Sequence, residues 1–125
     1  MSHMVKIDLE VKDLGALKSA CQRLGLEFVE GQKTARYWGD RTALCDHAIR
    51  AAGTSWEIGV RKEKGAYTLE ADFYGIEGRK MKEAVNGLRQ MYAVEVAKRA
   101  ARRKGYSVTE SKREDGTIAL RIRVA

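Results

Sequence analysis

Hydrophobic and polar residues alternate along several segments of this chain, and a period of two is typical of strands with one buried face. Two of these segments, residues 56–60 and 67–73, flank Lys64-Gly65, a dipeptide that suits a tight hairpin turn. In the register set by this turn, Val60 lies opposite Leu69 and all the apolar residues share one face. The other face then carries the charged residues Glu57, Arg61, Glu70 and Asp72.

A second hairpin is predicted near the end of the chain, where residues 106–108 and 118–124 alternate. Its apolar residues share a face only if the loop has three residues, Glu114-Asp115-Gly116, with the glycine in the left-handed conformation. This register places Val108 opposite Ile122. The outward face then shows Ser107, Thr109, Arg121 and Arg123.

Two other segments have the hydrophobic spacing of helices. The first follows an alternating segment at residues 5–11 and is predicted over residues 14–24, with Asp13 as its cap and Gly25 as its stop. The second is longer and is predicted over residues 77–104. Its apolar stripe consists of Met81, Val85, Leu88, Tyr92, Val96 and Ala100.

Small residues form a further face in the later turns of the long helix, where we expect close packing on a sheet. These residues are Ala93, Ala97, Ala100 and Ala101. Asn86-Gly87 could kink the helix, and Gly105 is predicted to end it.

Together these elements predict an α+β fold. We expect a single, mostly antiparallel sheet with two helices packed on one face, in the order β-α-β-(β)-β-β-α-β-β. A ferredoxin-like fold is one arrangement that fits this order. The optional strand falls in residues 31–42, a polar segment that contains Tyr37 and Trp38. One domain is expected over residues 1–125. Because the apolar strand faces lie on one side, the other face of the sheet should be open to solvent or a partner.

Composition places the chain among ordinary globular proteins, with 44% hydrophobic residues, 33% charged residues and no proline. It has no apolar run of the roughly 20 residues that span a bilayer and no signal pattern, so we expect no membrane association and a cytoplasmic location. Cys21 and Cys45 are predicted to be free thiols in a reducing compartment. The letters Ser2-His3-Met4 also occur in cloning scars, so the start could be partly vector-derived.

The net charge of +7 lies entirely in the C-terminal part of the chain. Residues 1–76 carry 11 Lys and Arg against 11 Asp and Glu, whereas residues 77–125 carry 13 against 6. This asymmetry suggests an anionic partner, and the candidate residues at the basic helix end are Lys98, Arg99, Arg102, Arg103 and Lys104. The alternative needs no ligand, because cations stabilise a helix C-terminus and Glu95 can pair with Arg99.

Candidate chemistry is sparse, and we expect no catalytic residues, no metal site and no cofactor. Cys45-Asp46-His47 brings a thiol close to an imidazole, but only His3 and Cys21 could complete a zinc site, without the usual paired spacing. On the sheet, the carboxylates of Glu57, Glu70 and Asp72 could share a proton or hold a cation. The favoured interpretation is that Arg121 and Arg123 neutralise them across neighbouring hairpins.

Several stretches of the chain, in this order and spacing, match a known family. They are Met1-Ser2-His3, 17–25, Trp56-Glu57-Ile58-Gly59, 67–75, Gln90-Met91-Tyr92-Ala93, 105–108 and 114–118. On these residues the chain resembles the small domain-of-unknown-function family, number 1257, that includes a hypothetical chloroplast reading-frame protein of red algae and cyanobacterial relatives. Residues 31–50 match least well. The resemblance implies a cytosolic accessory protein with no established activity, and a partner linked to an AAA+ ATPase.

The sequence therefore favours a non-enzymatic accessory or adaptor domain that binds a protein partner through its open sheet face or an edge strand. The candidate residues on the open face are Glu57, Arg61, Glu70, Asp72, Arg121 and Arg123. The alternative is nucleic-acid or polyanion binding through the basic helix end, and an enzyme is a distant third. The identity of the partner and the formation of homo-oligomers are left open.

Overall fold

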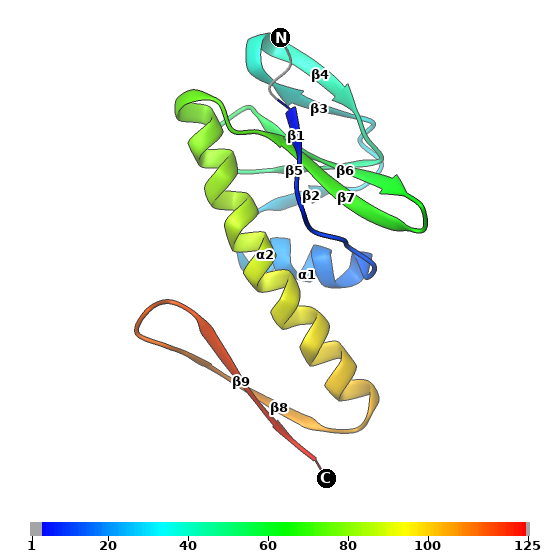
Figure 1. Ribbon diagram of the computed structural model, residues 1–125, viewed down its shortest axis with the longest axis vertical. Helices are drawn as coiled ribbons and strands as arrows, with labels where there is room; N and C mark the ends of the chain where they lie inside the picture. The colour runs from blue at the N-terminus through cyan, green and yellow to red at the C-terminus, as the bar shows by residue number, and fades with distance from the viewer. Residues whose placement is uncertain (1–3, 125) are drawn as a thin grey trace.

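The computed structural model describes residues 4–124 and confirms the α+β class (Figure 1). The expectations about Ser2 and His3 lie outside the described residues. In chain order the elements are β1 (Met4–Lys6), α1 (Leu14–Arg23), β2 (Glu27–Val29), β3 (Thr34–Tyr37), the short 3-10 helix η1 (Trp38–Asp40), β4 (Arg41–Leu44), β5 (His47–Arg50), β6 (Glu57–Glu63), β7 (Ala66–Asp72), α2 (Gly75–Arg103), β8 (Ser107–Lys112) and β9 (Ile118–Arg123).

The described strands lie in three sheets, where the sequence led us to expect one. The main sheet has the order β1-β7-β6-β5-β2, and all neighbouring strands in it are antiparallel. The pairs β3-β4 and β8-β9 are separate two-stranded sheets. Of the ferredoxin-like arrangement, the structure contains only the split β1-α1-β2 unit. The three strands β5, β6 and β7 lie between β1 and β2 in the sheet, so β1 is an edge strand.

The predicted register of the β6-β7 hairpin is confirmed, with Val60 opposite Leu69. Both turn residues have positive φ, 51° at Lys64 and 82° at Gly65, which matches the right-handed twist of the two strands. Four inward side chains of this hairpin, Ile58, Val60, Leu69 and Ala71, are fully buried beneath the two helices. The sheet and the helices thus share one hydrophobic core.

The first helix is held at both ends as its sequence suggests. The Asp13 side chain caps it by accepting a hydrogen bond from the Ala16 amide at 3.0 Å, and Gly25 follows it with φ of 71°. From α2, the Tyr92 hydroxyl accepts hydrogen bonds from the amides of Lys12 and Asp13, at 3.0 and 3.2 Å. This long-range contact fixes the start of α1 against the middle of α2.

The second helix runs without a break from Gly75 to Arg103, so Asn86-Gly87 does not interrupt it. Its first half packs on the main sheet, and its second half continues past the sheet to contact α1, β8 and β9 (Figure 1). The expectation that a small-residue face packs on the sheet is therefore wrong. Ala93 and Ala100, which belong to that face, are exposed.

The second face of the main sheet is only partly open, which corrects the expectation of a fully open face. The β3-β4 hairpin covers part of it, and Ala35, Cys45 and Ala48 form a small buried cluster there. A Cβ at Gly59 would lie 3.4 Å from the Cys45 Cβ and 3.5 Å from the Ala35 Cβ, so this glycine permits the close approach. The covered residues include Asp72, which is only 1% exposed.

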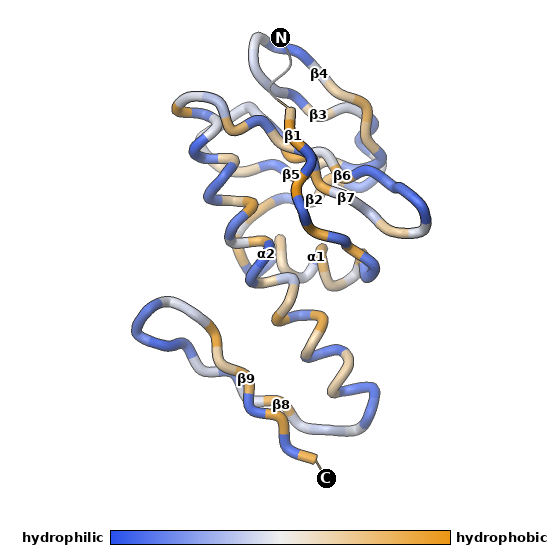
Figure 2. The backbone as a smooth tube through the Cα atoms, viewed as in Figure 1, coloured by the Kyte–Doolittle hydropathy of each residue, from blue (hydrophilic) through white to orange (hydrophobic). Residues whose placement is uncertain are grey.

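The last hairpin has the predicted loop and register. Gly116 has φ of 87°, Arg113 and Thr117 close the three-residue loop, and Val108 lies opposite Ile122. Its position differs from the expectation, because it packs against α2 and forms no pair with the main sheet. Pairing of Arg121 and Arg123 with the sheet carboxylates is therefore wrong. Figure 2 shows hydrophilic residues in the hairpin loop and at the end of α2.

Two glycines of α2 provide a test of this packing. A Cβ at Gly78 would lie 2.0 Å from the backbone carbonyl carbon of Phe73, whereas one at Gly87 would only touch the Leu24 side chain at 3.5 Å. We expect Gly78→Ala to lower the free energy of unfolding by about 2–4 kcal/mol. The matched Gly87→Ala should be neutral or raise it by up to about 1 kcal/mol, since alanine favours helix. Urea denaturation measures both, and equal effects would contradict the described packing.

Candidate functional site

Four charged side chains join the last hairpin to the two helices. Arg23 of α1 donates two hydrogen bonds to the carboxylate of Glu110 on β8, at 2.7 and 2.8 Å, and one to Glu95 of α2 at 3.1 Å. Lys98 of α2 lies 2.9 Å from Glu110 and 3.6 Å from Glu95. We call these four residues the anchor network. It joins α1 to α2 and β8, because Glu95 and Glu110 lie 72 and 87 positions after Arg23 in the sequence.

The anchor network strongly favours the ionised form of Glu110. Hydrogen bonds from Arg23 and then from Lys98 lower the pKa of this carboxyl from 4.5 to about 2. The same contact with Glu110 raises the pKa of Arg23. The network contains two basic and two acidic side chains, so its formal charges balance.

The structure divides the basic helix end into two groups. Lys98 belongs to the anchor network, and Arg99 donates hydrogen bonds to the Gly15 carbonyl at 3.1 Å and the Ser19 hydroxyl at 2.9 Å. Both residues hold elements of the fold together and are not free to bind an anion. Packing thus explains two of the five cations that the sequence singled out.

The remaining three cations lie beside two others from the hairpin. Register places Arg123 opposite Ser107, which follows the end of α2 by only a few residues, and Arg121 opposite Thr109. We define the cationic end as Arg102, Arg103, Lys104, Arg121 and Arg123, all of which are exposed. Among residues 4–124, its one ion pair is the contact of Arg103 with Asp13, at 3.6 Å. Ile122 and Val124 add exposed apolar surface, with 46% and 65% of their areas accessible.

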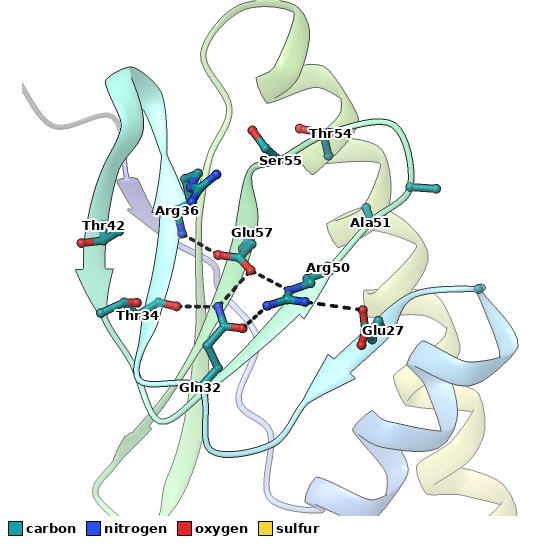
Figure 3. A pocket seen from close by; sticks show the side chains of 12 residues that line it. Glu27, Gln32, Thr34, Arg36, Thr42, Arg50, Ala51, Thr54, Ser55 and Glu57 are labelled. Carbon is teal, nitrogen blue, oxygen red and sulfur yellow. Dashed lines mark hydrogen bonds and ion pairs between the residues drawn. The ribbon is translucent and has the colours of Figure 1, made fainter.

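A second candidate site is a polar pocket of about 590 Å³ between the main sheet and the β3-β4 hairpin (Figure 3). Its centre is Glu57 of β6, whose carboxylate accepts hydrogen bonds from Gln32, from the Arg36 amide and from Arg50, each at 2.9 Å. These donors outweigh the cost of burial and lower the pKa of Glu57. Arg50 also donates to the Gln32 side chain at 2.8 Å and lies 3.9 Å from Glu27.

The other charged residues predicted on the open face do not form one site. Arg61 pairs with Glu70 at 3.6 Å. Asp72 is buried and accepts hydrogen bonds from two backbone amides, those of Tyr74 at 2.9 Å and Trp38 at 3.3 Å. Each carboxylate has its own donors, so the arrangement resembles no proton-sharing pair.

Cys45-Asp46-His47 shows no activated nucleophile. Burial raises the pKa of the Cys45 thiol, whose Sγ donates to the Gln32 carbonyl at 3.2 Å. The His47 Nδ1 accepts a hydrogen bond from the Gly31 amide at 2.9 Å, and Asp46 accepts one from the Lys62 amide at 2.7 Å. Burial also raises the pKa of Cys21, to about 12. Within residues 4–124, no three His, Cys, Asp or Glu side chains gather as metal ligands.

Sequence reasoning missed the pocket, because its residues come from the five strands β2 to β6 and from the loops next to them, between positions 25 and 57. The available signal was the alternation at residues 34–37, where Thr34 and Arg36 alternate with buried Ala35 and Tyr37. None of the described helices is long and apolar enough to cross a membrane.

Comparison with known proteins identifies the family. The model of the family of proteins of unknown function DUF1257 matches residues 20–121, so the chain belongs to this family. The match extends from α1 through β2–β7 and α2 into β9, and thus includes the whole pocket and all of the cationic end except Arg123. No curated protein and no solved structure matches the chain.

The anchor network predicts a specific pH dependence. Because the pKa of Glu110 falls from 4.5 to about 2 on folding, its stabilisation is present above about pH 4.5 and is lost as the pH falls towards 2. At pH 7 we expect Glu110→Gln to lower the free energy of unfolding by about 1–2 kcal/mol. This difference from the unmodified protein should shrink at pH 3 in urea denaturation. Glu114→Gln, in the exposed hairpin loop, is the matched control and should change little at either pH.

A Glu110→Gln effect that is equally large at pH 7 and below pH 2.5 would show that its charge does not stabilise the hairpin. A Glu114→Gln effect of the same size would show that any loss of negative charge on this basic protein destabilises it.

Proposed function

We propose that this member of the DUF1257 family is a non-enzymatic accessory or adaptor domain that binds an acidic, extended segment of a protein partner on its β8-β9 hairpin. The observation that carries the proposal is the cationic end, where five exposed cations have a single ion pair among the described residues. An acidic segment would neutralise them. A cytoplasmic location, expected from the free thiols of Cys21 and Cys45, belongs to the same proposal.

The geometry of the hairpin supports a polypeptide as the ligand. Among residues 4–124, β8 and β9 pair only with each other, so each has an edge whose backbone groups can pair with another strand. Ile122 and Val124 offer apolar contacts beside that edge. Self-association along β9 is disfavoured, because it would bring Arg121 and Arg123 close to the same residues of a second copy.

Nucleic acid is the alternative ligand, but the positions of the exposed aromatic residues favour a protein partner. Binding of single strands usually combines cations with exposed aromatic rings on which bases stack. Trp38 and Tyr74 are exposed, but both lie near Asp72 at the opposite end of the structure from β9 (Figure 1). The aromatic residue nearest to the cationic end in the sequence is Tyr106, which is half-buried. The link to an AAA+ ATPase rests on the family resemblance alone.

Charge reversal at the cationic end tests the proposal. We expect the double variant Arg121→Glu/Arg123→Glu to recover much less of a stoichiometric protein partner than the unmodified protein in affinity capture from cells that naturally express it. Arg99 is left intact, because it holds α1 against α2. The matched control is Arg79→Glu/Arg89→Glu, which reverses two exposed cations on α2. Quantitative mass spectrometry measures the recovery, with and without nuclease.

Three outcomes would contradict the proposal. The first is the repeated absence of any stoichiometric partner under gentle conditions. The second is equal recovery with the cationic-end variant, or equal loss with the control variant. The third is recovery that nuclease abolishes, which would favour the nucleic-acid alternative, since phosphate contacts dominate such binding.

A further inference from the structure

The lining of the pocket at Glu57 sets the kind of ligand that it can hold. Most of its twelve lining residues are polar or charged, and the only apolar side chains among them are those of Ala51 and Ala52. It has no aromatic ring to stack on a nucleobase and no large apolar surface for a lipid. Its volume of about 590 Å³ exceeds that of a monosaccharide. The pocket therefore suits a small molecule rich in hydroxyl or charged groups.

The floor of the pocket is preorganised and internally neutral. Gln32, Arg50 and Glu57 bond to one another, so their charges and donors are already matched. The nearby loop is also fixed, because Lys80 of α2 donates to the Gly53 carbonyl at 2.8 Å and the Trp56 amide donates to the Thr54 hydroxyl at 3.1 Å. A ligand would meet a rigid polar surface and would lose little affinity to ordering it.

One cation at this pocket has no such partner. The Arg36 guanidinium forms no hydrogen bond or ion pair with another residue in the described range 4–124; its backbone amide alone bonds Glu57. Thr42 is its direct partner across the β3-β4 pair, so the two side chains share a face. Figure 3 shows Arg36 between Thr42 and Ser55, with the Ser55 hydroxyl on the side of Arg36 and the Thr42 hydroxyl on the side away from it. Neither hydroxyl is engaged with a described residue.

We propose that this pocket binds a small phosphorylated sugar or polyol. The Arg36 guanidinium holds the phosphate, because its planar fork of donors matches phosphate oxygens, and Ser55 donates to the same group. The carboxylates of Glu27 and Glu57 accept hydrogen bonds from the ligand's hydroxyl groups. This site is separate from the β8-β9 hairpin and does not depend on the adaptor function.

Titration with ribose 5-phosphate tests the site, with inorganic phosphate, ribose and citrate as comparison probes. Calorimetry or amide chemical shifts at constant ionic strength report binding by the full chain. We expect ribose 5-phosphate to bind more tightly than each of the other three, with shifts at residues 34–57. Arg36→Gln removes the guanidinium but keeps the backbone amide that bonds Glu57, and should weaken binding about tenfold or more. Arg89→Gln, on the exposed surface of α2, is the matched control and should bind normally.

Each outcome of the titrations tests a separate part of the proposal. No detectable binding of ribose 5-phosphate, or unchanged binding by Arg36→Gln, overturns the site. Equal binding of inorganic phosphate shows a simple anion contact and overturns the sugar part of the proposal. Tighter binding of citrate overturns the phosphate part. Thermal unfolding of Arg36→Gln shows whether any loss of binding reflects misfolding. If this variant is misfolded, Ser55→Ala, at an exposed loop position, replaces it as the test, and unchanged binding by Ser55→Ala overturns the site.

Discussion

The anchor network is the interaction on which the C-terminal third of the structure depends. A two-stranded hairpin is at best marginally stable in water, because it cannot bury both of its faces. The β8-β9 hairpin packs against α2, and the hydrogen bonds from Arg23 to Glu110 also attach it to α1. Each charge in the network contacts two partners of opposite sign, and all four are partly buried. Removal of one would take a contact from two partly buried neighbours, at a cost greater than that of a surface ion pair.

The same network explains why the excess positive charge of the C-terminal part is concentrated at the cationic end. Glu95 and Glu110 are two of the six acidic residues after position 76, and both are occupied by Arg23 and Lys98. They are therefore unavailable to neutralise the cationic end. The cations that contact the anchor network or α1 stabilise the fold, and those beyond it are left for solvent or a partner. The charge pattern alone could not separate these two roles, because residues 98–104 of the helix end include cations of both kinds.

Local chemistry made the fold class and both main hairpin registers predictable from the sequence. Because side chains alternate between the two faces of a strand, a shift of the pairing by one residue would move the apolar residues of one strand to the other face. The glycines at positions 65 and 116 supply the positive φ that each loop needs. The cover over the second sheet face was not predictable, because it depends on small residues such as Ala35 and Gly59 that carry no periodic signal. Arg99 and Glu110 bond to Ser19 and Arg23, which lie 80 and 87 positions away, where spacing carries no information.

The long helix α2 sets the geometric relation between the two candidate sites. Lys80, near its start, holds the loop at Gly53 beside the pocket, and Lys98, eighteen residues later, holds Glu110 on the hairpin. At 1.5 Å per residue these two contacts are about 27 Å apart along the helix. A continuous helix fixes the distance between sites but does not switch between two arrangements, and energetic coupling requires such a switch. The structure thus holds the two candidate sites at a constant distance, which favours independent binding at the two proposed sites.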